Sequence, residues 1–428
     1  MLFLQVWTLL AAPTDLCATQ SGIQCYGDDI KDAGPLDSAE ACCDACRATS
    51  GCAAWTWNAE IDQHCWVKRG CSDQRQAKSY ISGTSPPPSP SPVPPSPAYH
   101  RVLNINSSSF MDTVQFFTEA DPTHGSVNFI SASEALADGL VRFNNGQIFM
   151  SADLKSEGTP RRSVRVFSKA TFTKGVMVIN LEHMPTGCGT WPAFWMCGPG
   201  WPSAGEIDIL EGVNLQTHDQ TTLHTSQGCS MAKVDPASFT GSWGKGSAGQ
   251  AATDCYVQAS GQYGNQGCPI INPSPSSYGS PFNDHKGGVI ATVWDDAGIR
   301  SYSWPAGSLP PDVAARLAPN EKSWGLPYAR FDFGGECDAS HFHDHQLIFD
   351  LTLCGDWAGA AFSQQCSGKA ANCDVYIADA ANVQEAYWLV NHVDVWSAAG
   401  GGVGSSHGLY QGPERRSRSG FSMARSVS

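Results

Sequence analysis

Residues 205–214 read GEIDILEGVN, a stretch in which three acidic residues alternate with branched apolar ones. A period of two predicts a strand with one charged face and one buried face. In a regular strand Glu206 and Asp208 would share the charged face, whereas Glu211 would point into the core. Because a buried unpaired carboxylate is costly, we expect a β-bulge at 209–210 that returns Glu211 to the charged face.

Two carboxyl groups on one face of a strand suit glycoside hydrolysis. Retaining glycosidases need a nucleophile and an acid/base about 5–5.5 Å apart, held at different pKa values. We therefore expect Glu206 to be the nucleophile and Glu211 the acid/base, with Asp208 supporting both. A solvated acidic strand or a calcium site is the alternative for so short a motif.

The sequence on both sides of this strand resembles a known family. The matching segments are 121–125 (DPTHG), 185–196 (PTGCGTWPAFWM), 200–202 (GWP), 223–226 (LHTS), 349–359 (FDLTLCGDWAG) and 385–388 (EAYW). Over residues 98–398 the chain resembles glycoside hydrolase family 16, in particular its fungal-type, laminarinase-like endo-β-1,3(4)-glucanases.

The resemblance implies an all-β, concanavalin-like jelly-roll sandwich with an open cleft, which agrees with the alternating strands of this region. It implies a β-glucan substrate with β-1,3 or mixed β-1,3/1,4 linkages, and no cofactor or metal. It places Trp191, Trp201 and Trp357 in the cleft, where indoles can stack on sugar rings, and His224 against the sugar or the acids. Arg165 is expected either to orient the nucleophile or a sugar hydroxyl, or to form a surface ion pair.

Two other functions remain open beside hydrolysis. A transglycosylase would use the same residues but pass the glycosyl group to a second sugar. A glucan-recognition protein would keep the fold without turnover. Both glutamates are present, which favours hydrolysis.

The composition limits the partners and the compartment. The 428 residues carry a net charge of −14, which argues against nucleic acid and anionic membranes as partners. The 17 cysteines indicate an oxidising compartment. Residues 1–20 are expected to be a signal peptide, although no basic residue precedes the apolar run. We expect a monomer that is secreted or bound to the cell wall, without a membrane span.

Residues 21–82 are expected to form a separate domain with seven cysteines. The order of its elements resembles a PAN/apple domain, a module that binds proteins or carbohydrates. We expect disulfides between Cys46 and Cys52 and between Cys65 and either Cys42 or Cys43, with zinc binding as the alternative. The unit also contains three tryptophans, which serve either as core or as a sugar-stacking platform: Trp55, Trp57 and Trp66.

The remaining boundaries follow from composition. Residues 83–97 are rich in Pro and Ser and predict an extended linker, and residues 399–428 predict a disordered tail. The catalytic region holds nine cysteines, an odd number, and Cys366 with Cys373 is the expected local pair. The three alternating histidines of the segment 341–345 are expected on one strand face, where a metal could bind, although the resemblance implies no ligand there.

Overall fold

The computed structural model describes residues 18–84, 99–398 and 402–405. The chain divides into two compact units, Met1–Pro95 and Ser96–Ser428, which are described separately. Among the described residues, none of the helices combines the length and apolar character needed to cross a bilayer.

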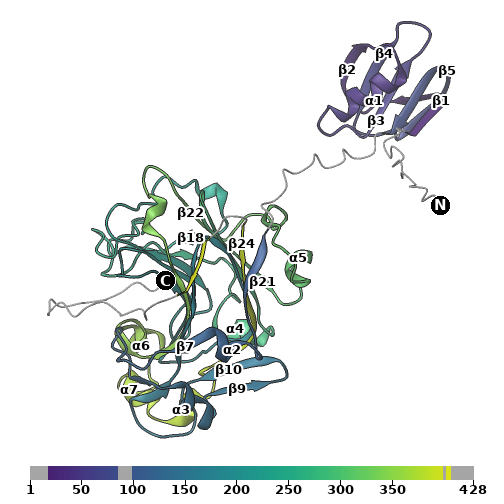
Figure 1. Ribbon diagram of the computed structural model, residues 1–428. Coiled ribbons are helices and arrows are strands. Elements are labelled where there is room, and N and C mark those ends of the chain that lie inside the picture. Colours follow the sequence, from purple (N-terminus) through teal and green to yellow (C-terminus); the bar gives the residue numbers. More distant parts are fainter. Residues whose placement is uncertain (1–17, 85–98, 399–401, 406–428) are drawn as a thin grey trace, which may run out of the picture. The chain divides into compact units, whose positions relative to one another are not determined.

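The N-terminal unit is an antiparallel sheet with one helix, α1 (Ala39–Arg47), against one face (Figure 1). The Ser38 side chain caps α1 by accepting a hydrogen bond from the Ala41 N–H at 3.1 Å. The strand order is β1-β5-β3-β4-β2, with β1 at Ala18–Tyr26, β2 at Asp29–Pro35, β3 at Ala54–Asn58, β4 at His64–Lys68 and β5 at Asp73–Thr84.

Disulfides and two tryptophans form the core of this unit. The expected pairs Cys46–Cys52 and Cys42–Cys65 are confirmed, so these thiols are not zinc ligands, and Cys25–Cys71 is a further pair. Trp55 and Trp57 are buried against α1 and therefore belong to the core rather than to a sugar platform. Trp66, on the neighbouring strand β4, pairs with Thr56 and therefore lies on the other face of the sheet, where it is half-buried.

The C-terminal unit is a sandwich of two large antiparallel sheets (Figure 1). The outer sheet has the order β22-β21-β20-β14-β24-β10-β9, with β6 also paired to β24. Its strands are β6 (His100–Ile105), β9 (Val141–Asn144), β10 (Gln147–Ser151), β14 (Gly175–His183), β20 (Gly288–Asp295), β21 (Gly298–Pro305), β22 (Ala329–Asp332) and β24 (Tyr387–Ser397).

The inner sheet carries the acidic strand at its centre. Its order is β18-β19-β17-β16-β15-β23-β12-β7. The strands are β7 (Val114–Phe116), β12 (Arg165–Ser168), β15 (Thr190–Cys197), β16 (Glu206–Glu211), β17 (Gln220–His224), β18 (Ser242–Trp243), β19 (Ile270–Ile271) and β23 (Gln346–Leu353). The expected jelly-roll sandwich is confirmed.

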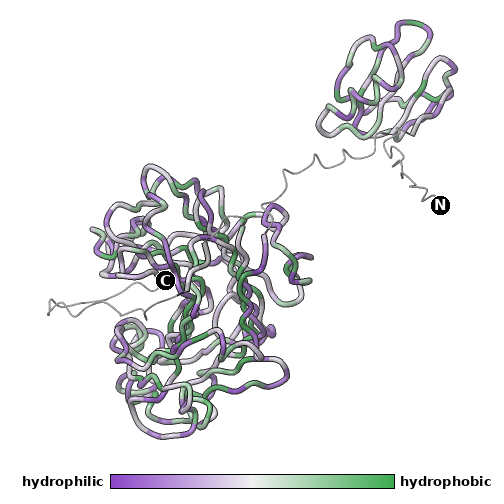
Figure 2. Tube along the Cα trace, viewed as in Figure 1, coloured by the Kyte–Doolittle hydropathy of each residue, from purple (hydrophilic) through white to green (hydrophobic). Residues whose placement is uncertain are grey.

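The other elements are short. Two small sheets pair β8 (Val127–Phe129) with β11 (Arg161–Ser163), and β13 (Ala170–Thr173) with β25 (Gly402–Ser405). The helices of this unit are α2 (Phe110–Thr113), α3 (Ala132–Ala137), α4 (Gly279–Asp284), α5 (Pro311–Ala314), α6 (Ala360–Gln365) and α7 (Cys373–Ile377). Hydrophobic residues concentrate along the strands of the two large sheets (Figure 2). Because alternate residues of both sheets meet there, the main core lies between them.

Several boundaries differ from the sequence predictions. The expected signal peptide and linker fall mainly on residues 1–17 and 85–98, which lie outside the described residues, while Ala18 already begins β1. The tail expected to be disordered contains β25, whose backbone pairs with β13. For those four residues a backbone ladder supplies the order that their composition does not indicate.

The cysteine pairing of the C-terminal unit corrects one prediction. Cys366 does not pair with Cys373, because Cys366 bonds to Cys188 and Cys373 bonds to Cys354. The other disulfides are Cys229–Cys337 and Cys255–Cys268, and Cys197 is the one free thiol among the described residues, buried in the inner sheet. The unpaired cysteine of the catalytic region is therefore a buried free thiol.

The histidine segment also differs from its prediction. Strand β23 begins only at Gln346, and His341 ends a short 3₁₀ helix, so the three histidines do not share a strand face. His345 is buried, and its Nε2 lies 2.7 Å from the Ala204 carbonyl oxygen. Burial lowers the pKa of His345 to about 3. This histidine is a neutral core residue.

Candidate active site

Strand β16 contains the bulge that its sequence predicts. On β15, the adjacent residues Phe194 and Trp195 pair with Leu210 and Asp208, so Ile209 has no partner across that ladder. The register against β17 shifts in the same interval. Two neighbouring strands therefore agree that β16 carries one extra residue at Ile209.

The bulge sorts the side chains of β16 onto two faces. Ile207 and Leu210 are fully buried in the core between the sheets. Glu206 and Glu211 are both only partly buried, and Asp208 lies between them with 2% exposure. The structure thus brings the three acids to one face of the inner sheet.

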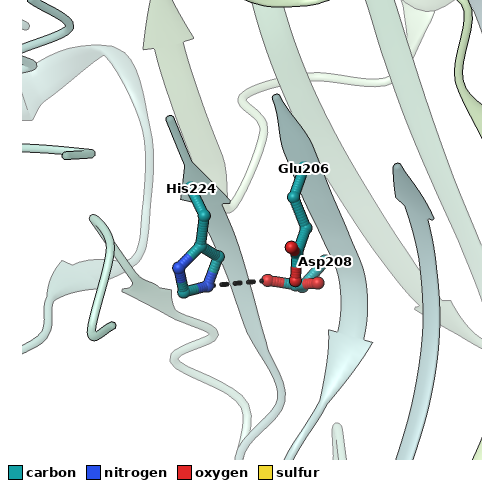
Figure 3. Close-up of side chains that lie close together, drawn as sticks. All are labelled: Glu206, Asp208 and His224. Atoms are coloured by element: carbon teal, nitrogen blue, oxygen red, sulfur yellow. Dashed lines mark ion pairs between the residues drawn. The ribbon is translucent and has the colours of Figure 1, made fainter. Parts of the chain in front are cut away.

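Glu206, Asp208 and His224 form a compact cluster on β16 and β17 (Figure 3). His224 lies directly across the ladder from Glu206, and its Nε2 is 3.1 Å from Asp208 Oδ2. The Trp201 indole N–H donates a hydrogen bond to Glu206 Oε2. One ligand atom from each member of the cluster lies within 4.8 Å of the others, a spacing that would also suit a cation. The ion pair of His224 with Asp208 and the ladder pairing of His224 with Glu206 bring these atoms together without a cation.

Burial dominates the electrostatics of this cluster. Burial and the neighbouring Asp208 raise the pKa of Glu206 to about 8, and burial raises the pKa of Asp208 to about 8 as well. Two adjacent buried carboxylates also repel each other, which contributes to the rise in the pKa of Glu206. At least one of the two carboxyls therefore keeps a proton near neutral pH.

Glu211 has a separate set of partners at the other end of the bulge. The Trp191 indole N–H donates a hydrogen bond to Glu211 Oε1 at 2.9 Å. Burial and Asp208 raise the pKa of Glu211 well above its usual range, while the Trp191 bond opposes that rise. A carboxyl with a raised pKa can keep a proton to donate at neutral pH.

The predicted tryptophans lie beside the acids. Trp191 and Trp357 pack edge to face, with ring centroids 5.7 Å apart, and both are partly exposed. Trp201 is also partly exposed next to Glu206. Each glutamate therefore has an indole at its side, and Trp357 extends the aromatic surface at the Glu211 end.

Arg165 lies farther away, on β12. It is 2% exposed and forms an ion pair with Asp350 at 3.5 Å, and its guanidinium lies 5.1 Å from the Trp195 ring. The expected surface ion pair is wrong in its location, because the pair is buried. The register links Arg165 to Asp350, Asp350 to Ala193 and Ala193 to Glu211, which places this ion pair in the cross-strand row of Glu211.

Sequence reasoning missed two groups near the acids. Asp350 was part of a matching segment, but nothing local marked it as the partner of Arg165, 185 positions earlier in the numbering (350 − 165). Asp219 and Tyr328 lie behind the bulge and touch its backbone. Tertiary folding alone brings these two residues to the bulge, so the sequence around each of them gives no signal of this contact.

Comparisons with known proteins give consistent matches. A family model described as "XgeA-like, catalytic GH16 domain" matches residues 114–396, and a PAN domain model matches residues 23–68. A "probable glycosidase" of Schizosaccharomyces pombe is 37% identical over 303 residues, which cover 70% of this chain and 69% of that protein. An endo-1,3(4)-β-glucanase of Arthroderma benhamiae is 37% identical, over 68% of this chain and 63% of that protein.

Solved structures match the same region. Laminarinase 16A from Phanerochaete chrysosporium, with β-glucans in its donor and acceptor sites, is 36% identical with a TM-score of 0.64, over 70% of this chain and 99% of that one. An elongating family 16 β-1,3-glucosyltransferase is 32% identical with a TM-score of 0.63, over 70% of this chain and 100% of that one. The C-terminal unit is thus similar both to a laminarinase and to a transferase.

Proposed function

Because the chain belongs to glycoside hydrolase family 16, we propose that it is an endo-acting retaining β-glucanase that hydrolyses β-1,3-glucans, with mixed β-1,3/1,4-glucans as a second substrate. The observation that carries this proposal is the bulge at Ile209, which leaves Glu206 and Glu211 on one face with different partners. Endo-1,3(4)-β-glucanases and a laminarinase among its relatives support the substrate class.

The first step forms a glycosyl-enzyme. Glu206 attacks the anomeric carbon, the glycosidic C–O bond breaks, and Glu211 gives its proton to the leaving oxygen. The raised pKa of Glu211 suits it to be protonated at this point. For this attack Glu206 must be ionised, so the proton that the two adjacent carboxyls keep must lie on Asp208 at that moment, while the Trp201 N–H donates a hydrogen bond to Glu206 Oε2.

The second step returns the enzyme to its starting state. Glu211, now ionised, takes a proton from water as the water oxygen attacks the anomeric carbon and releases Glu206. Two displacements at one carbon give a product with the β-configuration of the substrate. Trp191, Trp201 and Trp357 provide apolar surfaces for sugar rings, and His224 orients Asp208 or a sugar hydroxyl.

Arg165 is assigned an electrostatic role in this scheme. Its charge compensates Asp350, which lies in the same cross-strand row as Glu211. Burial still raises the pKa of Asp350 to about 7, while Arg165 opposes that rise. Since Asp350 in turn raises the pKa of Asp208, Arg165 limits the negative charge around the acids.

Product analysis tests the proposal and separates it from transglycosylation. Laminarin and lichenan digests should give oligosaccharides of intermediate size early, because an endo-enzyme cuts within the chain. Proton NMR of the nascent products should show the β-anomer first, and an α-anomer formed first would contradict the double displacement. Elongated products that dominate at ordinary substrate concentration would favour the transferase alternative, which the glucosyltransferase neighbour keeps relevant. Folded enzyme that binds these glucans without cleaving them would favour the recognition alternative.

We further propose that the N-terminal unit binds β-glucan and that the protein is secreted. Seven disulfides among the described residues support an oxidising compartment. On the sheet face opposite α1, the Trp66 ring lies 5.4 Å from His64 and 6.4 Å from Tyr80, which makes a partly exposed aromatic strip.

A single substitution in the full chain tests this strip. Trp66→Ala should weaken sedimentation with insoluble β-1,3-glucan and leave the hydrolysis of soluble laminarin unchanged. Tyr26→Ala, which removes an exposed aromatic on β1 of the same unit, is the matched control. Equal sedimentation of the Trp66→Ala variant and the parent protein would refute the strip as the binding site.

A further inference from the structure

The bulge that aligns the acids also interrupts the backbone hydrogen bonding of β16. An extra residue interrupts the regular exchange of hydrogen bonds between strands. At this bulge Ile209 is fully buried and the Glu211 N–H faces the fully buried Asp219, and an unpaired buried polar group costs about 1–3 kcal/mol. Some other group must therefore satisfy them.

A chain of three buried side chains meets these backbone groups. Asp219 Oδ1 accepts a hydrogen bond from the Glu211 N–H at 3.2 Å, and Asp219 Oδ2 accepts one from the Tyr328 hydroxyl at 2.9 Å. The Thr221 hydroxyl lies 2.7 Å from the Tyr328 oxygen. The Tyr328 and Thr221 oxygens lie 3.4 and 3.5 Å from the Ile209 carbonyl oxygen.

Asp219 is itself held rigidly. Its N–H donates to Ser277 Oγ at 2.9 Å, and its carbonyl accepts from the Asn272 N–H at 2.8 Å. Its side chain has no exposed surface. Both carboxyl oxygens make a hydrogen bond, an arrangement that neither an amide nor an alkyl side chain reproduces. Burying such a group is costly, and the contact that it provides is with the backbone of Glu211.

We propose that Asp219, assisted by Tyr328 and Thr221, fixes the bulge of β16 and is thereby a positioning residue for Glu211. Without this clamp the strand loses the contacts that favour the extra residue over a regular register. Since a slip of one residue moves a strand side chain to the opposite face, Glu211 would leave its place opposite the leaving group. The inference rests on the proposed acid/base role of Glu211.

The test compares two substrates in Asp219→Ala and Asp219→Asn variants of the full chain. On laminarin, whose leaving sugar needs a proton, Asp219→Ala should lower kcat/KM by about 100-fold, the scale of a misplaced catalytic group. On a dinitrophenyl β-laminaribioside the dinitrophenolate leaves without protonation, so formation of the glycosyl-enzyme should change little. Azide should then restore turnover by releasing the sugar as its β-glycosyl azide. Asp219→Asn should lose less, because one oxygen can still accept from the Glu211 N–H.

Control variants separate positioning from general damage. Asp394→Asn removes another buried carboxylate, which lies on β24 of the outer sheet and pairs with Arg316. This variant should show neither the substrate difference nor the azide effect. If Asp219→Ala lowers kcat/KM equally on both substrates, the inference is wrong. It is also wrong if Asp219→Ala shows no azide effect while Glu211→Gln does. If Glu211→Gln itself shows no azide effect, the acid/base assignment fails and takes the inference with it.

A second route avoids a folding failure of Asp219→Ala. Tyr328→Phe removes one hydroxyl and leaves the Asp219 contact with the Glu211 N–H in place. It should show the same substrate difference to a smaller degree. Equal losses on the two substrates in Tyr328→Phe would overturn the clamp.

Discussion

Replacing Glu206 by glutamine should stabilise the folded catalytic unit at neutral pH while ending its hydrolysis. Burial and the adjacent Asp208 raise the pKa of Glu206 to about 8, against an ordinary value of 4.5. Between these two pH values the folded state keeps a proton that the unfolded chain has released. The folded state therefore loses stability as pH rises through this window. Glutamine carries no ionisable proton and escapes this loss.

The size of the effect follows from the two pKa values. For a single site, the free energy of unfolding falls by about 1 kcal/mol at pH 5 and by about 3 kcal/mol at pH 7, relative to acid conditions. The stability difference between Glu206→Gln and the parent protein should therefore grow by about 2 kcal/mol from pH 5 to pH 7. For a unit of this size that corresponds to a change of about 3 °C in relative Tm. It is an upper value, because the ionisation of Glu206 is linked to that of the adjacent Asp208.

Differential scanning calorimetry at pH 5, 6, 7 and 8 measures this change. The matched control is Glu119→Gln, a substitution of an exposed carboxyl, whose Tm difference from the parent should stay constant with pH. Laminarin hydrolysis by the folded Glu206→Gln variant should be absent, since an amide cannot form the glycosyl-enzyme. A Tm difference for Glu206→Gln that does not grow with pH would refute the argument that burial raises the pKa of this acid.

Two further substitutions test the surroundings of the acids. Trp191→Phe removes the indole N–H that opposes the pKa rise of Glu211, so the alkaline limb of the kcat/KM profile on laminarin should move to higher pH; an unchanged limb would contradict this. Arg165→Met leaves the buried Asp350 without its cation and should cost about 3–5 kcal/mol of unfolding free energy in urea denaturation. Arg165→Met with Asp350→Leu should recover much of that loss, and a double variant no more stable than the single one would argue against the ion pair as the cause.

The sequence predicted the local features of the site because their causes are local. The position of the bulge follows from counting alternation along six residues, since Glu211 would otherwise be buried. The start of α5 likewise has a local cause, because Pro311 occupies the first helical position, which favours proline. Patterns within a few residues are set by side-chain direction, which the sequence carries directly.

Features that depend on distant segments could not be read in the same way. Cys366 is seven positions from Cys373, yet its partner is Cys188, 178 positions away. Nearness along the chain favours a pair only by loop entropy, which grows slowly with length, whereas the fold decides which sulfur atoms meet. The histidines of 341–345 failed for a related reason: alternation predicts one face only inside a strand, and β23 starts after them.

The bulge also explains how two identical side chains on one strand can take different roles. Without it, Glu206 and Glu211 would lie on opposite faces; with it, they share a face but not their neighbours. Glu206 lies in the regular half of β16, where the nearby Asp208 raises its pKa and His224 lies across the ladder. Glu211 follows the extra residue, and its partners come from Trp191 on the next strand and from Asp219 through its own N–H. The extra residue thus separates two electrostatic environments within a short strand, and that separation is what a nucleophile and an acid/base require.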